Sequence, residues 1–298
     1  MSALVQDGQY ASLPNGIRLH YASAGERGQP LLLFLHGFPE FWFAWHEQLK
    51  AFGDRYFAVA PDLRGFNLSD MPHEVSDYRP KLITQDIEQL IAHLGYRSCV
   101  MVAHDWGGAI AWNIAINQPD LLSRLIIINA THPYLFAKAL ASDPLQQQAS
   151  AYMNWLRASG SEKALAKDQF RVMEQLMLGM GRPSDHWFDE ATRQRYHAHW
   201  ARGLTGGVNY YRATPLYPPT AEDPGAGKLS LNPADFHCHL PVRVIWGMQD
   251  KALLPQLLNE LPVLVDDLII ERLPEATHWV VHEEPERVTE LIERFLYE

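Results

Sequence analysis

The sequence predicts an α/β fold with a mostly parallel sheet, helices on both of its faces, and one helical insertion. Short apolar runs alternate with amphipathic stretches through the first 131 residues, as in chains that build parallel sheets. That alternation stops between residues 132 and 233 and then resumes. We therefore expect core segments at 1–131 and 234–298, with a helical segment at 132–233 between them.

The N-terminal half supplies most of the predicted strands. Asn15-Gly16 separates two short strand-like runs and predicts a hairpin. The segment LITQDIEQLIAHLG (82–95) has apolar residues at helical spacing and ends at a glycine typical of a helix C-cap. Four continuous apolar runs are typical of strands buried on both faces: LLLFLHG (31–37), YFAVAPDLRG (56–65), CVMVAHD (99–105) and RLIIINA (124–130).

The second half contains the insertion and the rest of the core. Residues 164–178 carry a helical pattern, and the proline- and glycine-rich stretch 213–233 predicts a loop that returns to the core. Two more strands are predicted at LPVRVIWG (240–247) and LIIERLP (268–274), followed by a C-terminal helix at 284–298.

Composition narrows the class of protein. The 298 residues carry a formal charge of −10, and the basic residues are scattered, which argues against nucleic acid or an anionic membrane as partner. Two cysteines, Cys99 and Cys238, cannot build a disulfide framework. The N-terminus lacks the basic flank and apolar stretch of a signal peptide, and no apolar run reaches membrane-spanning length. We expect a cytoplasmic protein.

Three polar residues follow predicted strands, where the functional groups of open α/β sheets collect. Asp105 follows CVMVAH, Asp250 follows VRVIWGMQ, and His278 follows LIIERLPEAT. Their order along the chain, nucleophile then acid then histidine, resembles that of the α/β-hydrolase family. The stretch AHDWG (103–107) also fits that family's nucleophile elbow, with Ala103 where the family has its first glycine.

A fourth motif follows the strand at 31–35. In HGFPE (36–40), the backbone N–H of Phe38 is expected to form an oxyanion hole together with the N–H of Trp106.

Each of these residues also has an ordinary structural interpretation. Asp105 fits a helix N-cap, Asp250 a turn residue, and His278 an exposed loop histidine. The N-cap role leaves the glycines after Trp106 unexplained, as well as the acid and histidine downstream. His237-Cys238-His239 suggests a metal, but three adjacent residues do not readily point at one ion, so we expect an ordinary loop and no metal.

The chain closely resembles the epoxide hydrolase branch of the α/β-hydrolase family over nearly its whole length. The resemblance implies a hydrolase core with a helical cap, no cofactor, and a monomer or homodimer. It also implies a small hydrophobic epoxide and water as substrates. The motifs that carry it are HGFPEFW (36–42), PDLRGFNLSD (61–70), HDWGGAIAW (104–112), WGMQD (246–250) and ATHW (276–279).

In that family two cap tyrosines hold the epoxide oxygen. TGGVNYYR (205–212) resembles the second cap motif and assigns the role to Tyr211, with its neighbour Tyr210 as the alternative. The first cap tyrosine falls on Tyr152, although a packing role also fits that residue. Trp106, Phe38, His104 and Tyr210 are expected to contact the substrate.

These residue types favour a two-step hydrolysis. An ionised aspartate attacks a saturated carbon and forms an alkyl ester, while tyrosine hydroxyls assist the departing epoxide oxygen. Water activated by His278 and Asp250 then cleaves the ester, which gives a vicinal diol.

The alternatives share the scaffold. A haloalkane dehalogenase needs a second halide donor near the His-Gly turn, where Phe38 stands. A fluoroacetate dehalogenase needs arginines beside the nucleophile, where Trp106 and Ala109 stand, and a His-Trp pair where this chain has Tyr152-Met153. A serine-type esterase does not fit an aspartate elbow. If the chain were a non-catalytic ligand receptor, we would expect it to lack a member of the triad Asp105, Asp250 and His278, or the oxyanion turn; all are present.

Overall fold

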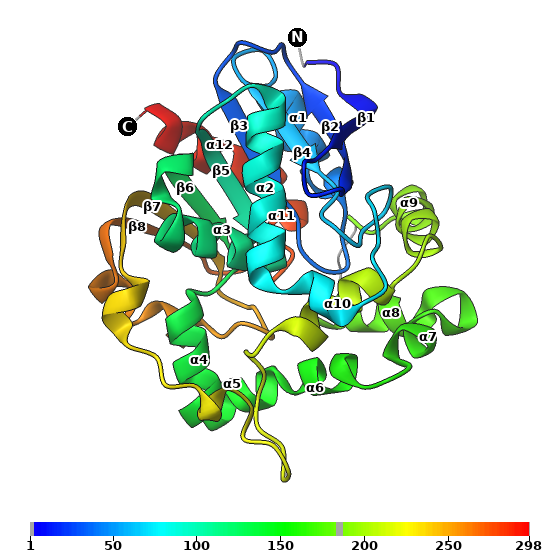
Figure 1. Ribbon diagram of the computed structural model, residues 1–298, viewed down its shortest axis with the longest axis vertical. Helices are drawn as coiled ribbons and strands as arrows, with labels where there is room; N and C mark the ends of the chain where they lie inside the picture. Colours follow the sequence, from blue (N-terminus) through cyan, green and yellow to red (C-terminus); the bar gives the residue numbers. More distant parts are fainter. Residues whose placement is uncertain (1–2, 183–186, 298) are drawn as a thin grey trace.

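A computed structural model describes residues 3–182 and 187–297, so residues 183–186 of the predicted insertion lie outside the described part. Its centre is an eight-stranded sheet in the order β1-β2-β4-β3-β5-β6-β7-β8 (Figure 1). The two pairings that involve β2 are antiparallel, and all others are parallel. The predicted α/β class with a mostly parallel sheet is confirmed.

The strands form where continuous apolar runs predict them. Every residue of β3 and β4 is buried, as expected for parallel strands covered on both faces. The predicted N-terminal hairpin is the antiparallel pair β1–β2. The strands are β1 (Gln6–Ser12), β2 (Arg18–Ala24), β3 (Leu31–Leu35), β4 (Phe57–Pro61), β5 (Cys99–His104), β6 (Leu122–Ile128), β7 (Cys238–Gly247) and β8 (Val265–Leu273).

Helices cover the two faces of the sheet. On one face, α2 (Pro80–Leu94) packs against α3 (Asp105–Asn117). On the other, α1 (His46–Phe52) packs against α12 (Pro285–Tyr297), and the short α11 (Val280–Glu283) precedes α12 (Figure 1). Gly95 ends α2 with a φ of 94°, a left-handed conformation that glycine adopts without strain, so the predicted C-cap is confirmed.

Between β6 and β7 the described chain forms helices and no strand. We call α4 to α10 the inserted helices. Their bounds are α4 (Pro133–Ser142), α5 (Pro144–Ala149), α6 (Ala151–Arg157), α7 (Ser161–Leu165), α8 (Lys167–Gly179), α9 (Glu190–Trp200) and α10 (Thr205–Ala213). The single helical pattern predicted at 164–178 is divided between α7 and α8, and α8 itself is kinked near its start, where Asp168, Gln169 and Phe170 have positive φ.

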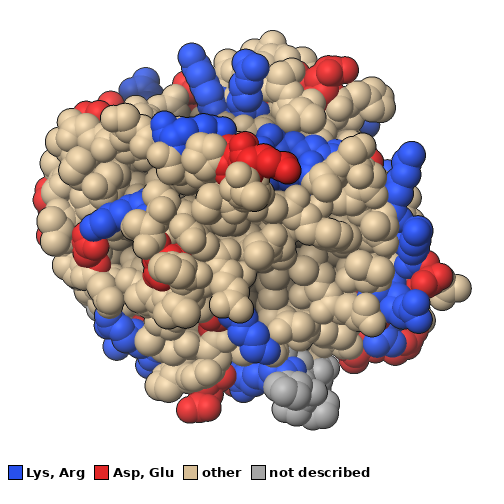
Figure 2. Space-filling view, turned by 90° about the horizontal axis from the view of Figure 1, so that it is seen from below, with Lys and Arg blue, Asp and Glu red and all other residues tan. Residues whose placement is uncertain are grey.

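Most of the inserted helices lie below the sheet in Figure 1, and α9 lies beside its lower half. Seen from that side, charged residues gather mostly toward the edges and leave a largely uncharged central area (Figure 2). Among the described residues, no helix combines the length and the apolar character that a bilayer crossing requires.

Candidate active site

The parallel strands bring distant segments together at one edge of the sheet. The register pairs Leu35 with Ala103, and His104 with Ile128, near the carboxyl ends of β3, β5 and β6. Gly247 of β7 likewise pairs with Leu273 of β8. The loops that leave these ends carry Phe38, Asp105, Asn129, Asp250 and His278.

Asp105 stands on a sharp turn between β5 and α3. Its φ is 50°, in the left-handed region that non-glycine residues rarely adopt. The turn brings α3 so close to the sheet that a Cβ on Gly107 would lie 2.4 Å from the Leu35 carbonyl oxygen. A Cβ on Gly108 would lie 2.2 Å from the Ala130 side chain. Both glycines of HDWGG are therefore required by close backbone packing.

Two groups face the two oxygens of the Asp105 carboxylate. The backbone N–H of Phe38 donates to Oδ1 at 2.7 Å. The Nε2 atom of His278 lies 3.6 Å from Oδ2, within ion-pair range. Gly37 has no room for a side chain, because a Cβ there would lie 2.2 Å from Oδ1.

The third predicted member, Asp250, orients the histidine. Its Oδ2 lies 2.8 Å from Nδ1 of His278. Its Oδ1 accepts the backbone N–H groups of Ala252 and Leu253, at 2.8 and 2.9 Å. All three predicted triad residues are thus brought together at one edge of the sheet.

Asn129 completes this arrangement, and no sequence pattern singled it out. It follows β6, and its side-chain amide donates to Asp250 Oδ2 at 2.7 Å, while its own Oδ1 accepts the Gly247 N–H at 2.8 Å. The residue lies inside the apolar run at 124–130 and reads there as the end of a strand. Asn129 therefore holds the Asp250 carboxylate from the side opposite the backbone donors.

The proton affinities follow from these contacts. Burial opposes the charge of Asp105, yet His278, His104 and the Phe38 N–H lower the pKa of its carboxyl below the usual value. Burial also acts to lower the pKa of His278, but the carboxylates of Asp250 and Asp105 outweigh it and raise the value to about 10. At neutral pH the resting site holds an imidazolium between two carboxylates.

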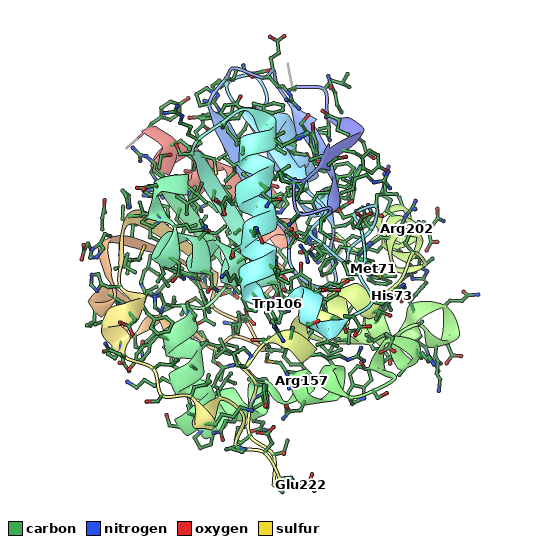
Figure 3. All side chains as sticks on the ribbon, in the orientation of Figure 1. Met71, His73, Trp106, Arg157, Arg202 and Glu222 are labelled. Carbon is green, nitrogen blue, oxygen red and sulfur yellow. The ribbon has the colours of Figure 1, made fainter. Side chains whose placement is uncertain are left out.

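A cavity of about 250 Å³ opens in front of Asp105. Its wall comes from both the sheet-flanking part and the inserted helices, and Trp106 lies at the junction between them (Figure 3). Tyr152 of α6 and Tyr211 of α10 line it together with Asp105 and Trp106. The remaining wall is mainly apolar and includes Ile83, Ile110, Pro133, Phe136, Met153, Leu216, Leu229, Leu231, Phe236 and Leu253.

The Trp106 ring packs edge-on against Tyr211, and Tyr211 and Tyr152 pack edge-on against each other. Their ring centroids lie 6.1 Å apart. Burial, followed by nearby acidic groups that include Asp105, raises the pKa of both hydroxyls well above the usual value. Both tyrosines are therefore neutral proton donors at physiological pH.

Tyr210 also borders the cavity, but its hydroxyl is directed elsewhere. It donates to the Arg64 carbonyl oxygen at 2.9 Å, in a buried contact between α10 and the loop after β4. Of the two adjacent tyrosines, Tyr211 is the one whose ring packs against Tyr152.

The other residues expected to contact the substrate lie at or behind this wall. The Phe38 ring packs edge-on against Tyr211, with centroids 5.3 Å apart. His104 lies behind His278, since its Nε2–H donates to the His278 carbonyl oxygen at 2.9 Å. Its Nδ1 faces Glu40 Oε2 at 3.2 Å, so both ring nitrogens have protein partners and the geometry favours a positioning role.

Glu40 is a further buried acid that the sequence did not single out, although it lies in the motif HGFPE. Its carboxylate contacts His104, accepts the Tyr196 hydroxyl of α9 at 2.9 Å, and contacts Nε2 of His282 in α11. Burial opposes its charge, but His282 and His104 hold its pKa well below the usual value. The Glu40 carboxylate thus contacts three separate parts of the chain, namely the end of β5, the short helix α11 and the inserted helix α9.

Comparison with known proteins identifies the family of the chain. A profile described as the alpha/beta hydrolase fold matches residues 30–285. The chain is 34% identical over 286 residues to an AB hydrolase superfamily protein of Bacillus subtilis, covering 95% of each chain. It is 34% identical over 292 residues to human epoxide hydrolase 4, covering 95% of this chain and 77% of the relative.

A solved structure agrees over the whole chain. An epoxide hydrolase from Bacillus megaterium, crystallised with its naphthyloxy-propane-diol product, superposes with a TM-score of 0.88 at 34% identity. The match covers 97% of this chain and 100% of that one.

Proposed function

The chain belongs to the α/β-hydrolase superfamily, in the branch of the epoxide hydrolases, and on this premise we propose that it opens small hydrophobic epoxides to vicinal diols. The observation that carries the proposal is the pairing of a carboxylate nucleophile with two neutral tyrosine hydroxyls across one apolar cavity. The inserted helices act as the cap of this cavity, since both tyrosines come from them.

In the first step, Asp105 attacks an epoxide carbon. Oδ1 is held by the Phe38 N–H, so Oδ2 is the oxygen available to form the new C–O bond. The ring C–O bond breaks and its electron pair moves to the epoxide oxygen. A carboxylate whose pKa is lowered is ionised at neutral pH and needs no base for this attack.

The tyrosines make the epoxide oxygen a workable leaving group. An alkoxide departs poorly unless a donor stabilises the developing charge. Tyr152 and Tyr211 line the cavity that contains Asp105, and one of their hydroxyl protons passes to the oxygen as the ring opens.

In the second step, water cleaves the ester. Nε2 of His278 takes a proton from the water, and the hydroxide oxygen bonds to the carboxyl carbon of Asp105. The charge that develops on Oδ1 is held by the N–H groups of Phe38 and Trp106. The ester C–O bond then breaks, and the diol leaves with a proton from the imidazolium. The second proton of the water passes from the Asp105 carboxyl to His278, which restores the resting carboxylate and imidazolium.

Ester formation itself prepares the histidine for this step. In the resting site two carboxylates keep the pKa of His278 at about 10, too high for a general base at neutral pH. Esterification removes the charge of Asp105, which lowers the pKa of the histidine. The imidazolium then loses a proton, which restores the tyrosine hydroxyl spent in ring opening, and His278 becomes a base only after the first step has occurred.

The dehalogenase alternative is weaker on this geometry. Phe38 offers an aromatic ring packed on Tyr211 where a second halide donor is needed. The indole of Trp106 packs edge-on against Tyr211, with ring centroids 5.1 Å apart. A cavity wall that is mainly apolar also gives no cation for a haloacid carboxylate among its described residues.

A substrate panel tests the proposal. The purified protein is incubated with aryl and aliphatic epoxides, with haloalkanes and with haloacetates, and diol and halide are measured separately. We expect diol from the epoxides and no halide release above that of an Asp105→Asn variant. Halide release without diol formation would replace the proposal with the dehalogenase alternative.

The covalent step is tested with His278→Gln, which retains the nucleophile but lacks the base. We expect an epoxide to add its own mass to this variant, and peptide mass spectrometry to locate the adduct on Asp105. The double variant with Asp105→Asn provides the control and is expected to stay unmodified. An unmodified single variant that still binds substrate would argue against the ester intermediate.

A further inference from the structure

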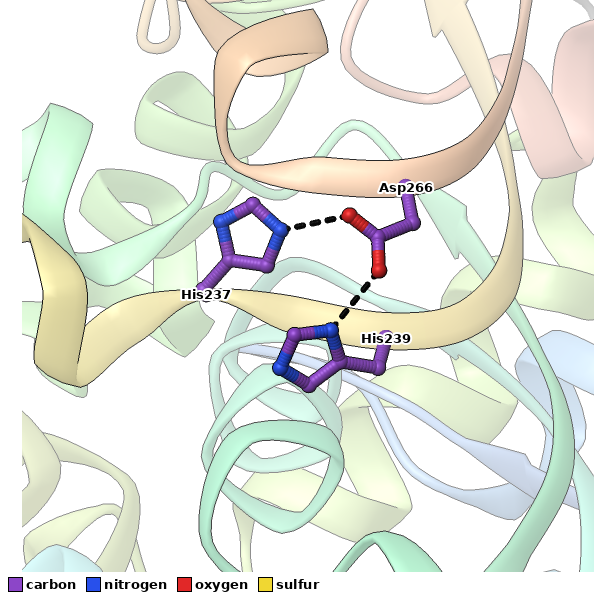
Figure 4. Close-up of side chains that lie close together, drawn as sticks. All are labelled: His237, His239 and Asp266. Carbon is purple, nitrogen blue, oxygen red and sulfur yellow. Dashed lines mark hydrogen bonds and ion pairs between the residues drawn. The ribbon is translucent and has the colours of Figure 1, made fainter.

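A cluster of potential metal ligands lies at the amino ends of β7 and β8, directly after Phe236, whose side chain lines the cavity. His237 and His239 flank Cys238, the first residue of β7, and Asp266 is the second residue of β8 (Figure 4). Asp250 follows the opposite, carboxyl end of β7. The cluster is therefore separate from the proposed catalytic residues.

Strand geometry puts the two histidines on one face. Residues i and i+2 of an extended chain point the same way, and the residue between them points the other way. Cys238 is buried, whereas the side chains of His237 and His239 are 31% and 76% exposed. Three adjacent ligands are thus excluded, as the sequence suggests, and the third ligand comes from the neighbouring strand.

The Asp266 carboxylate lies between the two rings. Its Oδ1 is 2.6 Å from His237 Nε2, and its Oδ2 is 2.7 Å from His239 Nδ1. The candidate ligand atoms of the three residues all lie within 4.8 Å of one another. We propose that His237, His239 and Asp266 form a surface binding site for a divalent transition-metal ion such as Zn²⁺.

The donor set fits that class of ion. Two imidazoles and one carboxylate are ligands of Zn²⁺, Ni²⁺ and Cu²⁺, whereas Mg²⁺ and Ca²⁺ prefer oxygen alone. Three protein ligands leave a fourth position for water in tetrahedral zinc. Zinc–ligand bonds of about 2.1 Å put tetrahedral ligand atoms roughly 3.4 Å apart. Each carboxylate–imidazole pair therefore opens by less than about 1 Å, and the widest pair, now within 4.8 Å, closes by at most about 1.4 Å. Since Asp266 and His239 are exposed, side-chain rotation achieves this.

The site also lies at a position where a link between β7 and β8 would stabilise their pairing. β8 is the edge strand of the sheet, and the β7–β8 ladder is irregular between Cys238 and Pro241. Proline has no N–H to donate to the ladder. A metal held by both strands joins their starts at this interruption, and it binds the folded state alone. We therefore infer a stabilising clip rather than a catalytic ion.

Calorimetric titration of the untagged full-length protein with ZnCl₂, after dialysis against a chelator, tests the site. We expect one Zn²⁺ per chain and a melting temperature that rises by a few degrees at saturation. His239→Ala and Asp266→Asn each remove one ligand and should weaken binding at least about tenfold. Diol formation should be unchanged in both variants, so failure here is distinguishable from failure of the proposed function.

His93→Ala is the matched control, because His93 is an exposed histidine on α2. It should bind Zn²⁺ like the parent protein. The proposal is overturned if the parent takes up no Zn²⁺ at millimolar concentration. It is equally overturned if His239→Ala gives the parent isotherm, or if His93→Ala weakens binding as much as the ligand variants do.

Discussion

At the scale of single residues, the site depends on side chains that have no freedom to move. Asp105 is fixed by a backbone conformation that costs a non-glycine residue about 1–3 kcal/mol, and the Phe38 N–H holds one of its oxygens. Asp250 is held by two backbone amides and by Asn129. The proposed acid and the proposed nucleophile are therefore both oriented by the protein itself.

The adjacent tyrosines of α10 provide a matched pair for testing the proton donor. Tyr211→Phe removes a hydroxyl that faces the cavity, and we expect kcat/KM for an epoxide to fall by at least about 100-fold. Tyr210→Phe removes a buried hydrogen bond to Arg64, which should cost about 1 kcal/mol of unfolding free energy with less than tenfold loss of turnover. Steady-state kinetics and denaturant unfolding of both variants make the comparison. The reverse ranking of turnover would assign the donor role to Tyr210.

At the scale of elements, the site is built from the turns that follow five strands. Four of these turns could be predicted, because in each case a continuous apolar run is followed by a motif with polar residues that could take part in catalysis. The turn after β6 could not, because Asn129 acts only through Asp250, a contact across 121 residues that leaves no local pattern. The role of Glu40 could not be predicted for the same reason, since its partners lie on other elements.

The observed ends of a strand differ from the predicted ends where its residues are no longer apolar. β8 begins at Val265, three residues before the predicted start. The apolar pattern does not extend that far, because the exposed Asp266 and Asp267 are the second and third residues of the strand. Pairing with β7 defines this part of the strand. Side-chain pattern alone does not.

The turn after β3 supplies a prediction at this scale. A Cβ on Gly37 would lie 2.2 Å from Asp105 Oδ1, so Gly37→Ala must displace either the carboxylate or the Phe38 N–H. Loss of one oxyanion donor typically lowers kcat by about 100- to 1,000-fold, and we expect a loss in this range. Gly179→Ala, which meets no heavy atom within 4 Å, is the control and should keep full activity. Circular dichroism should show both variants folded, and normal turnover by Gly37→Ala would argue against this packing.

At the scale of the molecule, aromatic side chains fasten the inserted helices to the rest of the chain. Trp200 of α9 donates to the Pro39 carbonyl oxygen at 2.8 Å, and Tyr196 donates to Glu40. Trp279, the neighbour of the catalytic histidine, donates to the Met177 carbonyl oxygen of α8 at 2.7 Å. The sequence predicted a helical insertion, but it gave no indication of these contacts, because each joins residues more than 100 positions apart.

The charges of the site also set how the stability of the whole molecule depends on pH. His278 has a folded-state pKa of about 10, above the value of 6.5 expected in the unfolded chain. Its stabilising contribution is therefore complete below about pH 6.5 and is lost as the pH rises toward 10. Asp105 has the opposite shift, so its contribution is present at neutral pH and is lost in acid. Both contributions coexist near pH 6, where the two carboxylates and the imidazolium are all charged.

We accordingly expect the unfolding free energy to decrease between pH 6.5 and 10, with a slope from His278 that approaches about 1.4 kcal/mol per pH unit. Urea unfolding of the parent and of His278→Gln at a series of pH values measures it, since the difference between the two curves removes other titrating groups. His93→Gln, which changes an exposed histidine, should reproduce the parent curve. If the parent and His278→Gln curves stay parallel over this range, the imidazolium is not held between two carboxylates in the resting protein. The proposal that ester formation converts His278 into a base would then be contradicted as well.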